Sequence, residues 1–259
     1  MRSNSLPTSF ETIMALWSRN FLQFRKTWLI SLFWIVLEPL FMLGALGYGL
    51  GSYVSQVQGM SYLEFFFPAL LCSSAVMVAY FEGTYANFTK LSHSKLYHAM
   101  LLAPMNTAQL LAGEVLWAAT KGLFSAIGVL TVASLMGAVG SFQILAALPV
   151  IFLASAVFAI FGMLVTSLVR NYDQIIYATS GLIMPMSLFS GTYFPLQGLP
   201  KALQAVAMIS PLTHAVMATR ELQQGKFTSG TAINIAILFL FLIVVGRFTQ
   251  KKFDQRLID

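Results

Sequence analysis

Four ionisable side chains fall inside long apolar runs of this sequence, namely Glu38, Glu82, Glu114 and Lys121. A charged group at the centre of a bilayer costs at least about 2.5–3.5 kcal/mol, so we expect these groups to be paired and to face the protein interior. Glu114 and Lys121, seven residues apart, share a helix face but lie about 10 Å apart along the axis. The sequence leaves the pairing of Lys121 open: Glu114 on its own helix, or Glu38 or Glu82 on another.

The sequence contains none of the common catalytic or nucleotide-binding motifs. A G-x-x-x-x-G-K-[ST] phosphate loop, a G-x-S-x-G nucleophile turn and an H-E-x-x-H zinc pair are all absent. The histidines are His93, His98 and His214, and the single cysteine, Cys72, lies in an apolar run. One cysteine provides no Cys-based metal site. We therefore expect no catalytic residue, no metal site and no cofactor in this chain.

The elements that carry these charges are expected to be membrane-spanning helices. The hydrophobic share is 58% and the charged share is 9%, whereas a soluble domain is roughly a quarter charged. The mean hydropathy is +0.77. The apolar runs are about 20 residues long, which is the length of a helix that crosses the hydrocarbon layer. We expect an all-α integral membrane protein with six transmembrane helices, at 28–50, 63–84, 107–135, 143–169, 174–194 and 231–249.

Residues 8–26 precede the first span and predict an N-terminal amphipathic helix. Thr8 and Glu11 have the spacing of a capping box just after Pro7. An apolar stripe with a tryptophan and a basic end favours a helix that lies in the membrane interface. The alternative is a plain solvent-side extension of the first span. The stripe consists of Phe10, Ile13, Met14, Trp17, Phe21 and Phe24.

The stretch 195–225, between the fifth and sixth spans, is too apolar for an ordinary loop. It is broken by Pro195, Pro200 and Pro211, and the polar pair 213–214 interrupts it. We therefore expect an extracellular re-entrant hairpin of two short helices that dip into the outer leaflet, in place of a seventh span. Non-helical backbone at that depth must be buried in protein or face water.

The distribution of lysine and arginine predicts the orientation. With the N-terminus inside, eleven basic residues lie on the cytoplasmic side and three lie outside, with Lys121 within the third span. We expect both termini in the cytoplasm and the chain in a bacterial inner membrane. The basic residues are scattered, so no nucleic-acid partner is expected. The chain divides into a cytoplasmic N-terminus with the interfacial helix (1–27), a transmembrane domain (28–249) and a cytoplasmic tail (250–259).

The segment between the second and third spans carries the most informative pattern. Residues 81–85 leave the membrane, and residues 90–104 follow as an amphipathic helix that Pro104 ends. This 90–104 segment resembles the cytoplasmic coupling helix of ABC-2 type exporter permeases, which docks into a groove on a separate ATPase subunit. The resemblance implies that contacts with the ATPase come from Lys95, Leu96, Tyr97, His98, Met100 and Leu101.

Further segments resemble the same family. Gly113-Glu114 and 117–121 look like the third span of the nodulation protein J branch, whose permeases export lipo-oligosaccharide. The runs 190–200 and 210–215 are similar to the family's extracellular re-entrant signature, and Glu38-Pro39 resembles an acidic-Pro pair of that branch. The resemblance covers nearly the whole chain. It does not identify the cargo, because related permeases carry drugs, glycolipids and polysaccharides.

The resemblance implies a half-transporter without ATPase activity of its own. The chain would pair with a second copy of itself or a homologous permease, and each would bind an ABC ATPase subunit that holds ATP and Mg²⁺. The expected cargo is an amphipathic glycolipid, lipo-oligosaccharide, polysaccharide or hydrophobic drug, moved from the cytoplasm or the inner leaflet in contact with membrane lipid. The alternative is an ATP-independent secondary carrier or channel, which needs an inverted repeat. The two halves show no convincing repeat.

Within such a permease, three groups of residues have open roles. The intramembrane charges have three alternative roles. They could link the 90–104 segment to the translocation path, fix helix packing as a structural pair, or relay protons. Tyr97 and His98 have two alternative roles. One is to anchor the ATPase, since exposed aromatic side chains often anchor partners, and the other is to pack on the span ends. Aromatic side chains line the path of a lipid tail, or they pack and face lipid. Those aromatic residues are Phe33, Phe41, Tyr48, Phe189, Tyr193 and Phe194.

Overall fold

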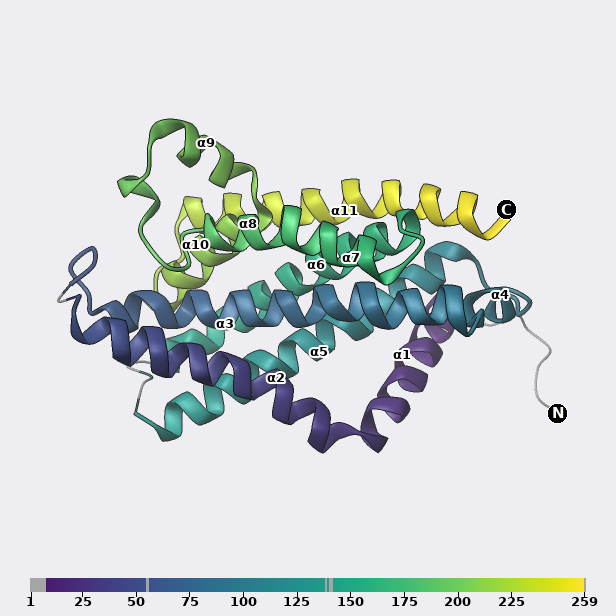
Figure 1. The fold of residues 1–259 in the computed structure, drawn as a ribbon, viewed down its shortest axis with the longest axis horizontal. Coiled ribbons are helices and arrows are strands. Elements are labelled where there is room, and N and C mark those ends of the chain that lie inside the picture. Colours follow the sequence, from purple (N-terminus) through teal and green to yellow (C-terminus); the bar gives the residue numbers. More distant parts are fainter. Residues whose placement is uncertain (1–7, 55, 138, 140–141, 259) are drawn as a thin grey trace.

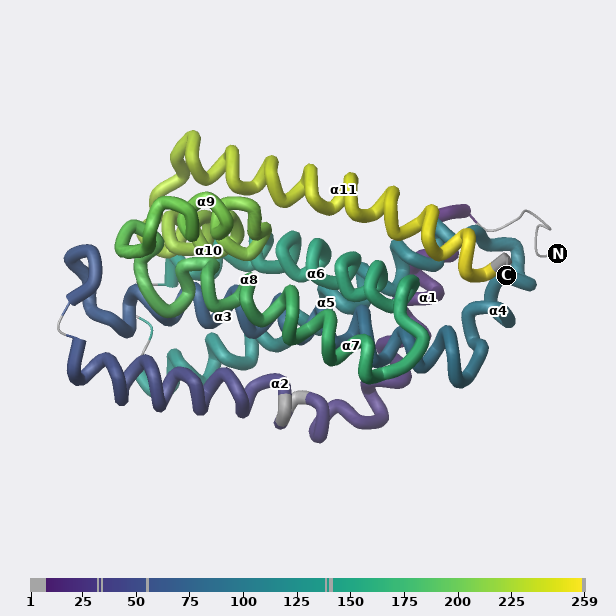
Figure 2. The backbone as a smooth tube through the Cα atoms, turned by 45° about the horizontal axis from the view of Figure 1, so that its top comes forward, coloured from purple at the N-terminus to yellow at the C-terminus, as the bar shows by residue number. Residues whose placement is uncertain are grey.

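The computed structural model describes residues 8–54, 56–137, 139 and 142–258 (Figure 1). These residues are helical or lie in short connections, and the only extended pairing among them is an isolated bridge between Val57 and Met60. The long helices run side by side along one axis (Figures 1 and 2). The predicted all-helical fold is therefore present.

Five stretches of the described chain are long and apolar enough to cross a membrane. The first is α2 (Trp28–Met42) with η1 (Leu43–Gly49) and η2 (Leu50–Ser52), and the second is α3 (Tyr62–Phe81) with η3 (Glu82–Ala86) and η4 (Thr89–His93). The third is α5 (Thr107–Leu135), the fourth is η5 (Phe142–Ala147) with α6 (Leu148–Leu168), and the fifth lies in α11 (Ser229–Ile258). They cover five of the six predicted spans.

The predicted span 174–194 is shorter in the structure. The helical run there consists of α7 (Tyr172–Ala178), η6 (Thr179–Ile183) and α8 (Met184–Leu188). The chain turns soon afterwards, because Gly191 adopts a φ of +79° that few side-chain-bearing residues adopt. A sixth candidate span exists only if α9 (Lys201–Ile209) and α10 (Pro211–Gln223), which meet at 89°, are counted as one.

The helices form a bundle with two distinct ends. α3, α5 and α6 pack against one another, α11 lies on one side of them against α6, and α2 lies on the other side against α5 (Figure 2). α1 (Ser9–Lys26), α4 (Leu96–Met100) and the C-terminal end of α11 lie at one end, which we call the terminal end (Figure 1). The α2–α3 connection, α9 and α10 lie at the opposite end (Figure 1).

Glycine residues allow the central helices to approach closely. A Cβ on Gly83 would lie 2.5 Å from the carbonyl oxygen of Ala159, and a Cβ on Gly162 would lie 2.6 Å from that of Tyr80. A Cβ on Gly122 would meet the carbonyl oxygen of Ala75 at 2.6 Å. Small residues at helix crossings permit such backbone contact in membrane proteins. α3 is therefore fixed against both α6 and α5.

The 90–104 segment is divided rather than forming one helix. Its first part, through His93, continues the long helical stretch that begins at Tyr62. Lys95 then adopts a left-handed conformation with φ 49°, which ends that stretch and redirects the chain into the short α4. The prediction of a single helix over 90–104 is therefore wrong, because the helix is interrupted at Lys95.

The N-terminal helix has the predicted start. The hydroxyl of Thr8 accepts from the Glu11 N–H at 3.3 Å, and the Glu11 carboxylate accepts from the Thr8 N–H at 2.8 Å. Hydrogen bonds from the Thr8 backbone and side chain lower the pKa of Glu11, which strengthens the cap in its charged form. Part of the apolar stripe packs on α5, since Trp17, Phe21 and Phe24 all contact the ring of Trp117.

The α9–α10 pair is held at its bend by polar contacts. Pro211 begins α10, where its missing N–H is tolerated. The Thr213 hydroxyl donates to the Ala207 carbonyl at 2.6 Å. His214 places its ring nitrogens 2.8 Å from Asn234 Oδ1 in α11 and 2.9 Å from the Met208 carbonyl oxygen. The bend is thereby fixed to the last helix.

Candidate functional site: a buried ion-pair network at the terminal end

Glu114 lies at the centre of a charged network formed by α1, η4 and α5. Its side chain is fully buried, and its carboxylate accepts from Lys90 Nζ at 2.7 Å. It also pairs with Arg19 Nη2 at 3.3 Å and accepts from Asn20 Nδ2 at 2.9 Å. A buried carboxylate is stable only when such partners replace its lost water. Three separate elements are thereby joined at one side chain.

Lys90 and Asn20 extend this network. Lys90 Nζ also donates to Asn87 Oδ1 at 3.0 Å and to Asn20 Oδ1 at 3.3 Å. Asn20 Oδ1 accepts from Arg19 Nη2 at 2.7 Å as well. All three N–H donors of the Lys90 ammonium group therefore have acceptors within the protein. The sequence instead predicts that Lys90 lies in a cytosolic loop.

A second ion pair lies deeper, between η3 and α5. Lys121 Nζ donates to Glu82 Oε2 at 2.8 Å, and Trp117 Nε1 donates to Glu82 Oε1 at 2.9 Å. Of the pairings that the sequence leaves open for Lys121, the structure forms the one with Glu82. Glu114 instead pairs with Lys90 and Arg19.

The Glu82–Lys121 pair and the Lys90 end of the Glu114 network border the same cavity, which has a volume of about 510 Å³. Its wall includes Asn20, Phe24 and Thr27 on the N-terminal side, and Glu82, Lys90, Trp117 and Lys121 from η3, η4 and α5. Ser94 and Leu96 of the 90–104 segment complete it. A displacement of that segment would therefore change the surroundings of both ion pairs.

Glu38 lies apart from this network, which corrects its predicted membership. Its side chain is exposed on α2, next to a cavity of about 90 Å³ whose wall includes Ser73, Ser74 and Ser187. Among the ion pairs of the described residues, none involves Glu38. A carboxylate in a span is stable only beside polar groups or water, and the three serines line the same cavity as Glu38.

The 90–104 segment presents only some of its predicted contact residues to solvent. Lys95 and His98 are exposed, whereas Leu96, Met100 and Leu101 are half-buried. Met100 accepts a contact from Arg19 Nη1 to its sulfur at 3.3 Å. The most exposed large apolar side chain here is Leu102, at 90%, which was not among the predicted contacts.

Tyr97 is fully buried, so it cannot be an exposed anchor. Its ring lies 6.3 Å from that of Phe253 in α11, which agrees with the alternative of packing on the span ends. Its hydroxyl lies near the Glu114 carboxylate but forms no hydrogen bond of regular geometry. Burial, together with the negative charge of Glu114, raises the pKa of Tyr97 well above its usual value, and the phenol stays protonated.

The six aromatic residues predicted to line a path lie in three separate places. Phe33, Phe41 and Tyr48 are exposed on the α2–η1 stretch. Phe189 lines a cavity of about 370 Å³ together with Phe161 and Phe241.

The remaining two aromatic residues lie in the turn after α8. Tyr193 and Phe194 are half-buried there. The Tyr193 carbonyl accepts from the Tyr62 hydroxyl at 3.1 Å, and its ring lies 5.9 Å from that of Phe66. These contacts tie the turn to the start of α3.

The sequence did not predict that Arg19, Asn20 and Lys90 belong to the site. Arg19 and Asn20 lie on the polar side of an amphipathic helix, and Lys90 lies among basic loop residues. Only Glu114 itself indicated such partners. A carboxylate in a span needs a cation nearby, and no lysine or arginine lies three or four residues from Glu114 on its own helix.

Comparison with known proteins decides the family. The family described as "ABC-2 type transporter" matches residues 11–223, which include most of α1, the three ion pairs and the α9–α10 pair. The chain belongs to the ABC-2 type transporter family. Members of this family are membrane subunits of transporters, and the ATPase is a separate subunit. This agrees with the absence of a phosphate loop from the sequence.

The ABC-2 relatives extend over nearly the full chain. "Nodulation protein J" of Rhizobium leguminosarum bv. viciae is 34% identical over 240 residues, which is 93% of each chain. "Nodulation protein J" of Rhizobium meliloti (strain 1021) is 33% identical, over 93% of this chain and 92% of its own. "Inner membrane transport permease YadH" of Escherichia coli (strain K12) is 24% identical, over 89% of this chain and 90% of its own. No solved structure gives a significant match.

Proposed function

We propose that this chain is the permease subunit of an ABC exporter that moves an amphipathic glycolipid or lipo-oligosaccharide across a bacterial inner membrane, driven by a separate ATPase. The observation that carries the proposal is the Glu114 network. Through it, the 90–104 segment is connected to α1 and α5 by charge-assisted hydrogen bonds of 2.7–3.3 Å. The lipo-oligosaccharide class is taken from the relatives named nodulation protein J.

The ATPase would dock at the terminal end. Lys95, His98 and Leu102 form an exposed patch with one large apolar side chain beside basic and aromatic groups. Burial of the exposed Leu102 side chain in a pocket on a partner would remove apolar surface from water, which favours binding. We name these three residues the docking patch.

Movement of the docking patch would be transmitted to the membrane-spanning helices by the Lys90–Glu114 ion pair. Lys90 lies at the end of the helical stretch Tyr62–His93, and its contact with Glu114 joins that stretch to α5. Closure of two ATPase subunits on ATP would push two such stretches together. In a dimer of permeases, the exposed carboxylate of Glu38 and the exposed aromatic residues of α2 would then face the cargo path between the subunits.

The test is co-purification with the ATPase encoded by an adjacent gene. Leu102→Asp should reduce the ATPase recovered with the tagged permease at least tenfold, because it replaces the apolar side chain with a charge. Leu135→Asp is the matched control, since Leu135 is 83% exposed and lies at the other end of α5. Equal recovery with Leu102→Asp and Leu135→Asp would exclude the docking patch as the contact.

Transport provides the second readout. Vesicles that contain the permease and its ATPase should move a fluorescent glycolipid only with ATP, and Leu102→Asp should abolish that movement. Equal transport by the permease alone would instead support the ATP-independent carrier.

A further inference from the structure

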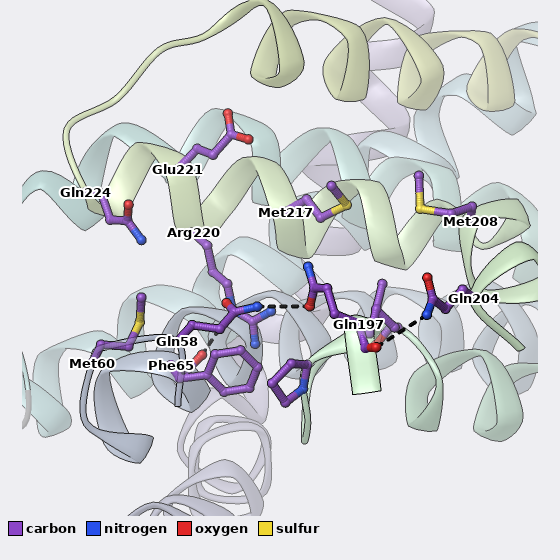
Figure 3. Close-up of a pocket in the computed structure, with 13 residues that line it drawn as sticks. Gln58, Met60, Phe65, Gln197, Gln204, Met208, Met217, Arg220, Glu221 and Gln224 are labelled. Atoms are coloured by element: carbon purple, nitrogen blue, oxygen red, sulfur yellow. Dashed lines mark hydrogen bonds between the residues drawn. The ribbon is translucent and has the colours of Figure 1, made fainter. Parts of the chain in front are cut away.

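A pocket with polar and apolar walls, drawn in Figure 3, lies among α9, α10 and the α2–α3 connection. These elements are at the opposite end of the bundle from the docking patch (Figure 1). The volume of the pocket is about 320 Å³. It is bordered by the α2–α3 connection, the η7 turn (Leu196–Gly198), α9 and α10. Its wall includes Gln58, Gln197, Gln204 and Gln224, the methionines Met60, Met208 and Met217, and Phe65, Arg220 and Glu221.

Arg220 provides the positive charge of this pocket. Its Nε donates to the Phe65 carbonyl at 3.1 Å, its Nη2 donates to the Gly191 carbonyl at 2.7 Å, and its guanidinium lies 3.7 Å from the centre of the Phe65 ring. These contacts hold the side chain in one orientation. They leave Nη1 without a hydrogen-bond partner among the described residues.

No carboxylate neutralises Arg220 within the described part of the chain. The ion pairs found there do not include it. Glu221 is adjacent in sequence, but its carboxylate accepts from the hydroxyls of Thr228 and Thr231. Figure 3 shows the Glu221 carboxylate directed away from the guanidinium. An oriented cation beside a pocket, without a counter-ion, favours an anionic ligand.

The glutamine residues add neutral hydrogen-bonding groups. Gln58 Nε2 donates to Gln197 Oε1 at 2.9 Å, and Gln204 Nε2 donates to the Gln197 carbonyl at 3.4 Å (Figure 3). Gln204 Nε2 also donates to the Leu199 carbonyl at 2.8 Å. Gln58 Oε1, Gln197 Nε2 and Gln204 Oε1 form no hydrogen bond among the described residues. Such amide groups both donate and accept, which suits the hydroxyls of a sugar.

We propose that this pocket binds the head group of the cargo as it leaves the membrane, and that the head group is a sugar with an anionic substituent. Arg220 contacts the anion, and the glutamine amides contact hydroxyls. This inference rests on the proposed function, because it assigns the pocket to exported cargo. The opposite end of the bundle is the outer face in the predicted orientation.

The test measures binding of small probes to the full chain in nanodiscs of phosphatidylcholine, without ATPase. The probes are glucose 6-phosphate, glucose 6-sulfate, glucose and inorganic phosphate. The two anionic sugars should bind at least tenfold more tightly than glucose or inorganic phosphate. Equal affinity for glucose would exclude the role of the charge, and equal affinity for inorganic phosphate would exclude the role of the sugar.

Gln197→Glu tests the site without removing Arg220. The new carboxylate can still accept from Gln58 but adds a negative charge to the pocket, so it should weaken binding of both anionic sugars at least tenfold and leave the affinity for glucose within twofold. Gln255→Glu is the matched control, because Gln255 is exposed near the end of α11, at the terminal end. Unchanged binding of the anionic sugars by Gln197→Glu would overturn the assignment.

The two proposals fail separately. Probe binding requires no ATPase, so a negative result here leaves co-purification through the docking patch unaffected. If the ATPase did not co-purify with the permease, the exporter assignment would be wrong. A measured affinity of the pocket for anionic sugars would still stand.

Discussion

Neutralising Glu114 should destabilise the protein strongly. Glu114→Gln keeps an oxygen that can accept from Asn20 but removes the negative charge that Lys90 and Arg19 share. The amide that replaces one oxygen also directs its own donors at Lys90. Both cations would then lie near a neutral group, and Lys90 is almost as buried as Glu114, with a side chain that is 12% exposed.

The size of the effect follows from the distances. Two unit charges 2.7 Å apart attract by about 6 kcal/mol at an effective dielectric constant near 20. Much of this attraction offsets the cost of dehydrating both groups, and removal of one partner of a buried pair typically costs about 3–5 kcal/mol. The contact with Arg19 contributes less, because that side chain is 32% exposed and water screens it.

The assay is reversible unfolding in mixed micelles, and it includes a double-mutant cycle. Glu114→Gln should lower the free energy of unfolding by about 3–5 kcal/mol. Lys90→Met should lower it less, because Glu114 keeps Arg19. The double variant should be more stable than the sum of the two losses predicts, by about 0.5–3 kcal/mol.

A matched control neutralises a carboxylate outside the network. Asp173 is exposed in the first turn of α7, so Asp173→Asn should lower stability only by about 0.3–1 kcal/mol, which is the size of a helix-dipole effect. A loss for Glu114→Gln no larger than that of Asp173→Asn, or additive losses for Glu114 and Lys90, would refute the reasoning about the network.

Three other predictions concern packing and topology. Tyr97→Phe should leave the free energy of unfolding equal or higher, because it removes a buried hydroxyl that forms no hydrogen bond of regular geometry, whereas Tyr97→Ala should lower it by about 3–5 kcal/mol through a cavity; equal losses in chemical denaturation would contradict the packing assignment. Gly162→Ala should lower the melting temperature, because its Cβ would lie 2.6 Å from the Tyr80 carbonyl oxygen. Because the single native cysteine is buried, Lys95→Cys should react with an impermeant maleimide only in inside-out vesicles, and Lys226→Cys only in right-side-out vesicles. The reverse pattern would invert the orientation.

Much of the fold could be predicted from the sequence because bilayer thickness imposes the length of each span. Five predicted spans correspond to helical stretches of the structure. The start of α1 was predictable from Thr8 and Glu11, because a capping box is a local contact. The end of α8 and the break at Lys95 were not, because each depends on a backbone conformation that the surrounding packing selects.

The site was predictable only in part. Charged residues within apolar runs identified Glu82, Glu114 and Lys121, but their partners depend on which helices become neighbours. Helical spacing cannot show that α1 lies against α5, so it assigned no role to Arg19 or Asn20. The burial of Tyr97 was unpredictable for the same reason, since its neighbour Phe253 is far away in sequence.

The contact between Gly83 and Gly162 limits which parts of the bundle can move. With backbone against backbone there, and with Gly122 against the Ala75 carbonyl, α3, α5 and α6 are in direct backbone contact. These three helices would shift as a single rigid body when force is applied at the terminal end. Any opening of a passage then has to come from how two such bodies separate, and from the more peripheral α2 and α7–α8 run at their margins.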